Sequence, residues 1–73
     1  MNYGQTHVYG VSLSYLMANG ERSFSYYEIP AESENEATDF VRQGFYREHP
    51  LAFYEPDVSA KFLYTDSWSY LRF

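Results

Sequence analysis

The chain contains no cysteine, few basic residues and no apolar run long enough to cross a membrane. Without cysteine it can form neither a disulfide nor a thiolate zinc site. Its N-terminal residues show no basic stretch followed by an apolar one, so we expect no signal peptide and a cytoplasmic location. Five basic residues stand against ten acidic ones, which argues against direct binding to a phosphate backbone.

Length predicts a single domain that spans residues 1–73. A chain this short buries only roughly 60% of the surface that its unfolded form exposes, so it needs an additional source of stability. Aromatic residues make up 22% of the sequence. Because each buried aromatic side chain removes about 150–250 Å² from water, we expect the aromatic residues to supply most of the core.

The N-terminal half predicts a β-hairpin. Over residues 9–17 large apolar side chains alternate with glycine, serine and finally Leu16, which is typical of a half-buried strand. Asn19 and Gly20 then favour a two-residue type I′ turn, and a second strand follows over about residues 22–29.

A two-residue turn fixes the expected register of this hairpin. It places Tyr15 opposite Phe24 and Leu13 opposite Tyr26, so that one face is apolar and aromatic. The other face is then rich in serine and carries Tyr27.

A helix is predicted after the hairpin. Pro30 ends the second strand because it cannot donate to the sheet. Ser33 and Glu36 form a capping box, in which each side chain accepts a hydrogen bond from the backbone of the other. The sequence His49-Pro50 ends the helix.

One apolar stripe runs along this predicted helix, with the spacing of a single face. We expect Phe40 and Phe45 to anchor the helix on the sheet, and Gly44 to mark the closest approach of the two backbones. The members of the stripe are Ala37, Phe40, Val41, Gly44 and Phe45.

The C-terminal part predicts a loop and then one or two further strands. Leu51, Phe53 and Tyr54 are expected to pack against the core from the loop. Alternation resumes over residues 58–64, and the tail forms either one long strand or a hairpin that turns at residues 66–67. The predicted fold is therefore α+β, a two-layer domain with an antiparallel sheet of three to four strands and one helix in the order ββαβ(β).

Five acidic residues without an intervening Lys or Arg are the first candidate binding feature: Glu28, Glu32, Glu34, Glu36 and Asp39. They account for the formal net charge of -5, because the other acidic and basic residues balance. Acids in a first helical turn are favoured by the helix dipole, which explains part of the run. The remainder crowds one corner without counter-charge, and this predicts a basic partner. These excess acids are Glu28, Glu32 and Asp39.

The nine tyrosines are the second candidate feature. A core of this size cannot hold them all with every hydroxyl hydrogen-bonded, so several are expected at the surface. Exposed Tyr with interleaved Ser is typical of protein-binding surfaces. The expected partner-binding tyrosines are Tyr27, Tyr46, Tyr64 and Tyr70.

No catalytic residue, metal ligand or cofactor-binding motif is predicted. His7 and His49 stand alone, without a second ligand at a metal-binding spacing. Ser33 is interpreted as a helix cap and not as a nucleophile. Aromatic stacking on single-stranded bases is disfavoured because the surrounding charge has the wrong sign. We therefore expect a non-catalytic protein-binding module without a cofactor.

In size, acidity and Tyr-rich strands the chain resembles small phage-encoded inhibitors of bacterial defence, the anti-CRISPR proteins among them. The resemblance covers the whole chain in its general character, rests on no diagnostic motif and transfers no functional residue. It implies an inhibitor that occupies the basic surface of a nucleic-acid-binding enzyme or complex, in the cytoplasm of the host cell.

Two other functions remain open from the sequence. In a DNA mimic, spaced carboxylates would imitate phosphates, although the basic and aromatic residues weaken this interpretation. In an assembly subunit, a sheet edge would pair with a second copy. The aromatic tail over residues 62–73 is the edge we expect to pair, which predicts a homodimer.

Overall fold

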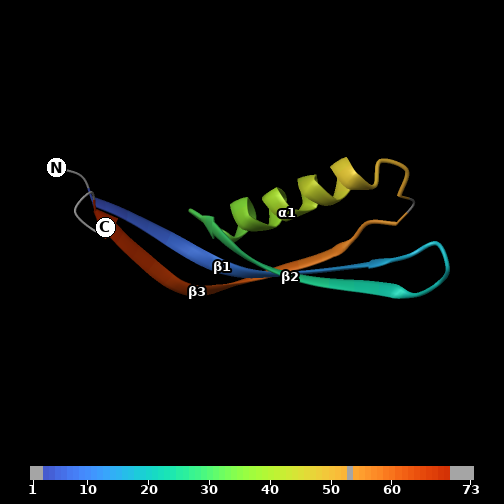
Figure 1. Cartoon of the computed structure of the whole chain (residues 1–73), viewed down its shortest axis with the longest axis horizontal. Coiled ribbons are helices and arrows are strands. Elements are labelled where there is room, and N and C mark those ends of the chain that lie inside the picture. The colour runs from blue at the N-terminus through green and yellow to red at the C-terminus, as the bar shows by residue number, and fades with distance from the viewer. Residues whose placement is uncertain (1–2, 53, 70–73) are drawn as a thin grey trace.

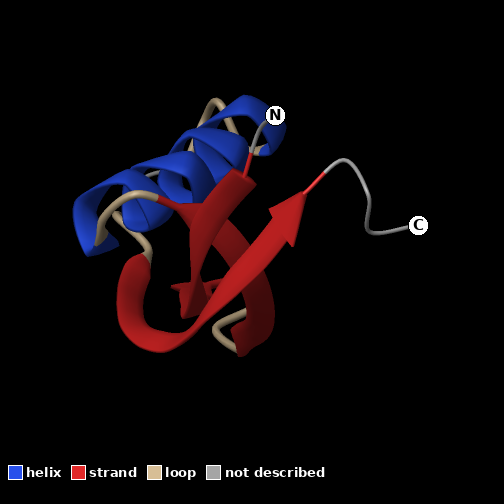
Figure 2. Ribbon diagram, turned by 90° about the vertical axis from the view of Figure 1, so that its left-hand side faces the viewer, coloured by secondary structure: helices blue, strands red, loops and turns tan. Residues whose placement is uncertain are grey.

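The computed structural model describes residues 3–52 and 54–69, which form three strands and one helix. The elements in chain order are β1 (Tyr3–Leu16), β2 (Arg22–Ala31), α1 (Glu34–Glu48) and β3 (Asp57–Ser69). The strands make an antiparallel sheet with the order β2-β1-β3, and α1 lies along one face of it (Figures 1 and 2). The predicted α+β fold with the order ββαβ is thus confirmed.

The sheet is longer than the helix that covers it. β2 pairs with β1 only as far as His7 and Ala31, whereas β3 continues along β1 to the pair Tyr3 and Ser69. The two longer strands therefore project as a ribbon beyond α1 (Figure 1), and the molecule measures 52 × 21 × 20 Å. Residues 66–67 lie inside β3, so the described part of the tail is one strand without a turn there.

The loop between β1 and β2 differs from the predicted type I′ turn. The Met17 N–H donates to the Glu21 carbonyl at 2.7 Å, and the Gly20 N–H donates to the Met17 carbonyl at 3.0 Å. Gly20 has a φ of 89°, but no non-glycine residue in the described ranges has a positive φ, and a type I′ turn would require one at Asn19. The prediction of a two-residue turn was wrong because the loop spans residues 17–21.

This longer loop shifts the hairpin register by one residue. Ser14 pairs with Phe24 and Leu13 pairs with Ser25, in place of the predicted partners. Because side chains alternate between faces, a shift of one residue moves every β2 side chain to the opposite face. Phe24 and Tyr26 consequently lie on the face away from α1, which we call the open face.

The core lies between α1 and the central strand. Val11 on β1 is fully buried, and the helix contributes residues spaced by four. The buried cluster consists of Tyr9, Val11, Leu13, Ala31, Ala37, Val41 and Phe45. The expectation that Phe45 anchors the helix is confirmed.

Phe40 and Gly44 do not have their predicted roles. Phe40 is 65% exposed, and a Cβ added at Gly44 would meet no atom within 4 Å. The buried stripe is narrower than predicted, and Phe40 lies about 100° around the helix axis from Val41. The three-stranded sheet is too narrow to cover that flank, so Phe40 overhangs the β2 side, where it lines a groove with Tyr27.

The loop after α1 also departs from the prediction. Leu51 is 88% exposed and Tyr54 is 65% exposed, so neither packs into the core. The Ala52 N–H donates to the His49 carbonyl at 3.1 Å, so the chain turns directly after the helix. Phe53, the third residue of that prediction, lies outside the described residues.

Candidate functional site

The junction between β2 and α1 is built around one cap. Ser33 is the N-cap residue, with φ -154° and ψ 164°, and its hydroxyl accepts a hydrogen bond from the Glu36 N–H at 3.1 Å. The Glu36 carboxylate accepts from the Glu32 N–H at 2.8 Å. The predicted cap is confirmed, but Glu36 reaches the residue before Ser33 and not Ser33 itself.

Replacement of Ser33 by alanine is expected to lower the free energy of unfolding by about 1 kcal/mol, because the Glu36 N–H loses its acceptor. Chemical denaturation measures this change. Ser33→Asp is the matched control, since aspartate also caps, and it should stay within about 0.5 kcal/mol of the parent. Equal losses in both variants would show that the hydroxyl contributes nothing as a cap.

A groove opens beside this cap, and we call it the acidic groove. It has a volume of about 530 Å³ and brings together the start of β1, the end of β2 and the first turn of α1. Its lining residues are Thr6, His7, Pro30, Ala31, Glu32 and Glu36. His7 is held by a 2.9 Å hydrogen bond between its Nδ1 and the Thr65 hydroxyl of β3. The groove therefore combines two carboxylate side chains with a fixed imidazole.

The acidic residues differ in their counter-charges. Asp39 forms an ion pair with Arg42 at 3.3 Å, which corrects the expectation that it lacks one. Within the described residues the other ion pair joins Arg22 and Asp57, so the four remaining carboxylates of the run have none. These four are Glu28, Glu32, Glu34 and Glu36, all exposed.

Three of these carboxylates surround the start of the helix and form what we call the acidic corner: Glu32, Glu34 and Glu36. The prediction that Glu28 shares this corner was wrong, because Glu28 lies apart, on the open face of β2 opposite Gly10. The positive end of the helix dipole stabilises carboxylates in the first turn. The corner thus keeps its negative charge at the surface at a modest cost in stability.

The predicted tyrosines do not gather around this corner. Tyr27 lies on the α1 side of β2, Tyr46 on α1 and Tyr64 on β3, and all three are exposed. Tyr46 packs the edge of its ring on Phe45, with 5.3 Å between ring centroids. Tyr70 lies outside the described residues. The predicted partner-binding residues therefore occupy several separate surfaces.

Two exposed aromatic residues were missed because the wrong register placed them in the core. Phe24 is 76% exposed and Tyr26 is 58% exposed, both on the open face. The Tyr26 ring lies across β1, where a Cβ added at Gly10 would overlap its hydroxyl group. The absence of a side chain at Gly10 thus lets an aromatic ring lie flat on the open face.

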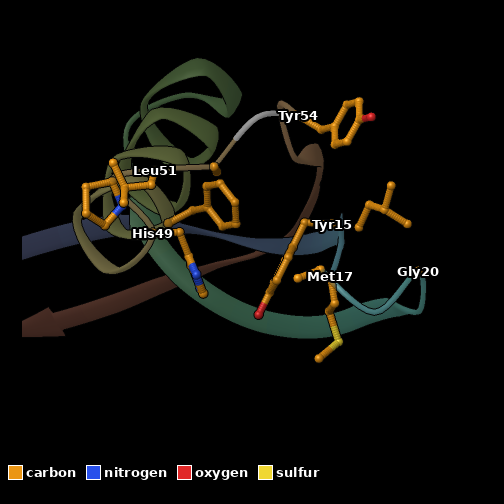
Figure 3. A pocket seen from close by; sticks show the side chains of 11 residues that line it. Tyr15, Met17, Gly20, His49, Leu51 and Tyr54 are labelled. Atoms are coloured by element: carbon orange, nitrogen blue, oxygen red, sulfur yellow. The ribbon is translucent and has the colours of Figure 1, made fainter.

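A second and larger groove lies at the opposite end of the helix (Figure 3). It has a volume of about 830 Å³ and separates the β1–β2 loop from the loop that follows α1. Tyr15, Met17, Leu51 and Tyr54 are among its mostly apolar lining residues (Figure 3). The two ends of α1 therefore differ in character, one acidic and one apolar.

In the part of the chain that the structure describes, no three His, Asp or Glu side chains are placed to hold a metal ion. No polar or charged side chain described there is buried. Among the same residues, no helix is long and apolar enough to cross a membrane. The chemical groups described above are therefore presented at the surface, where they can make contacts with another molecule.

Comparison with known proteins gives no relative: no known protein family, no curated protein and no solved structure matches this chain.

Proposed function

We propose that this protein is a non-catalytic inhibitor that binds a basic surface of a nucleic-acid-binding enzyme or complex. The observation that supports it is the acidic corner, where Glu32, Glu34 and Glu36 carry no ion pair within the described residues. An anti-defence role in a phage-infected bacterium, as the anti-CRISPR proteins have, is the biological setting we propose for such an inhibitor.

The acidic groove gives this proposal a specific contact. A partner's Arg or Lys side chain that entered the groove would meet carboxylates from Glu32 and Glu36. Arginine suits such a site because its planar guanidinium donates to two carboxylate oxygens at once. Since Glu36 also holds the Glu32 N–H, its carboxylate is already positioned before a partner arrives.

Uncompensated surface charge acts mainly on the encounter of two proteins. Complementary charge raises the association rate. Salt weakens this effect because it screens charges that are farther apart than the Debye length, about 10 Å at 0.1 M. We therefore expect binding to the partner to be fast at low salt and strongly dependent on salt.

Reversal of charge at the corner should slow association. Glu32→Lys combined with Glu34→Lys leaves the Ser33 cap and the Glu36 carboxylate in place. The association rate at low salt is expected to fall by about tenfold or more, with a flatter salt dependence. Affinity capture from a bacterial lysate, identified by mass spectrometry, supplies the partner, and surface plasmon resonance measures the rate.

The matched control reverses two exposed acids far from the corner, Glu48 and Glu55. This double variant has the same net charge as the corner variant, so a general charge effect would slow both equally. Equal rates for the corner variant and the parent would refute the proposal. Circular dichroism checks that each variant stays folded.

Competition distinguishes an inhibitor of nucleic-acid binding from a protein that binds elsewhere on the partner. Duplex DNA or RNA that the partner binds should compete with this protein for the captured complex. Coexistence of both ligands on the partner would show that the acidic corner binds a surface unrelated to nucleic acid.

A further inference from the structure

The outer edge of β2 lacks the features that usually prevent one sheet from pairing with another. β2 is an edge strand of the sheet and pairs with β1 on one side only. This pairing runs without a register shift from Arg22 to Ala31. The central segment, residues 23–27, contains no charged residue and no proline. Edge strands are commonly protected by such residues or by bulges, so this segment is open to pairing.

β3, the edge strand on the opposite side of the sheet, is better protected against pairing with another sheet. Its register with β1 shifts between Val8 and Tyr9, which indicates a bulge. It also carries Asp57 and Lys61 on the open face, opposite Ser14 and Gly10. Bulges and charges both disfavour pairing with another sheet. The structure thus favours β2 over residues 57–64 of β3 as the pairing edge.

Exposed aromatic side chains flank the β2 edge on both faces. Phe24 and Tyr26 lie on the open face. On the other face, Tyr27 and Phe40 line a groove of about 270 Å³ that also includes Ser25. Clusters of exposed apolar side chains are typical of protein interaction sites. A molecule that paired with β2 would cover aromatic surface on both sides of the sheet.

We propose that this edge pairs with β2 of a second copy of the chain, antiparallel, about a two-fold axis at Ser25. In that register Arg22 of each copy lies opposite Glu28 of the other, so the contact occurs twice. Phe24 lies opposite Tyr26 of the second copy on the same open face. Opposite charges at directly opposed positions stabilise neighbouring strands. Phe24 is the more exposed of the two aromatic residues, because the Tyr26 ring lies over Gly10 of its own β1.

Symmetry restricts the choice of register. In an isologous interface each contact occurs twice, so the two-fold axis of two antiparallel β2 strands must fall on one residue. An axis at Phe24 would place Arg22 opposite Tyr26, and an axis at Tyr26 would place Phe24 opposite Glu28. Among the three central positions, the axis at Ser25 is the one that brings the opposite charges together.

The Arg22 side chain lies on the open face, where Nη2 donates to the Asp57 carboxylate of β3 at 2.7 Å and to the Ser14 hydroxyl of β1 at 3.1 Å. In the single chain it therefore reaches across β1, away from the outer edge of β2. In the proposed dimer the guanidinium turns to that outer edge and exchanges Asp57 for Glu28 of the second copy. The Glu28 side chain has no ion pair within the described residues.

The dimer would be one continuous sheet with both helices on the same face. The acidic corners would stay at the surface, because they lie beyond the end of β2. Tyr27 and Glu28 would instead face the second copy, which removes them from the predicted partner-binding set. Dimerisation is therefore independent of the proposed inhibitor function.

Cysteine cross-linking tests the register, and the natural chain contains no cysteine that would interfere. In Ser25→Cys the two thiols would face each other across the axis, with Cβ atoms about 4.5–5.5 Å apart. In the matched control, Ser23→Cys, the two thiols would lie four residues apart along the strands, about 13 Å. Both serines are half-buried on the α1 side of the same strand.

Under mild oxidation Ser25→Cys should form a covalent dimer at least about tenfold faster than Ser23→Cys, because pairing raises the effective concentration of its thiols. The unmodified protein should show a mass above that of the 8.6 kDa monomer in light scattering at micromolar concentration. A monomeric mass, or equal cross-linking of the two variants, would overturn the proposal.

Charge reversal tests the same register without a covalent bond. Glu28→Arg would place two arginines opposite each other and should raise the dimer dissociation constant by about tenfold. Glu34→Arg makes the same charge change away from the edge and should leave that constant unchanged. Dimerisation that is equally strong in both variants would contradict the pairing of Arg22 with Glu28.

Discussion

Replacement of Phe45 by alanine is expected to lower the free energy of unfolding by about 3–5 kcal/mol, the typical cost of removing a buried phenylalanine ring. Phe45 is 4% exposed. The centroid of its ring lies 4.9 Å from that of the Tyr15 ring and 4.8 Å from that of the His49 imidazole. The variant would lose the contact that joins the end of α1 to β1. Circular dichroism during thermal and chemical denaturation measures the effect.

Phe40→Ala is the matched control for this experiment. It removes the same side chain from the same helix, but Phe40 is an exposed residue. Its cost should stay within about 0.5 kcal/mol, as for other surface substitutions. A loss of about 3–5 kcal/mol in Phe40→Ala as well would show that Phe40 packs in the core, as the helical spacing predicted.

Enlargement of Ala37 to leucine is expected to destabilise the protein by about 1–3 kcal/mol through overpacking. Ala37 is fully buried in the core cluster between the helix and the sheet. A larger side chain would push the first half of α1 away from the sheet. The free energy of unfolding, measured by denaturant titration, should show the loss.

Gln43→Leu supplies the comparison, because it places the same side chain at an exposed position of the same helix. We expect a change within about 0.5 kcal/mol there. If Ala37→Leu has the same free energy of unfolding as the parent, the helix can move away from the sheet without a loss of stability.

Local sequence patterns predicted the helix well. Its start at Ser33 and its end before Pro50 depend on hydrogen bonds and steric limits within a few residues. The strands were also predictable, since alternation in β1 reflects burial of one face against α1. The β1–β2 register was not, because Asn19-Gly20 is compatible with more than one loop length.

The candidate site could be predicted only where its residues are close together in the chain. The acidic corner was identified because its residues are neighbours in the chain and the helix start holds them together. The ion pair of Asp39 with Arg42 depends on side-chain conformation, although its spacing permits it. The exposed pair Phe24 and Tyr26 was missed because the longer loop shifts the register by one residue, which reverses the face that they occupy.

The kinds of elements, their order, the helix cap and the excess of acidic charge at the start of the helix all follow from local sequence. These features depend on backbone preferences and on neighbours along the chain. The central position of β1 in the sheet, the exposure of Phe40 and the open edge of β2 depend instead on the packing of the whole domain. Those features depend on which distant segments meet, and a three-stranded sheet is too narrow to bury every apolar residue that the local pattern places on one face.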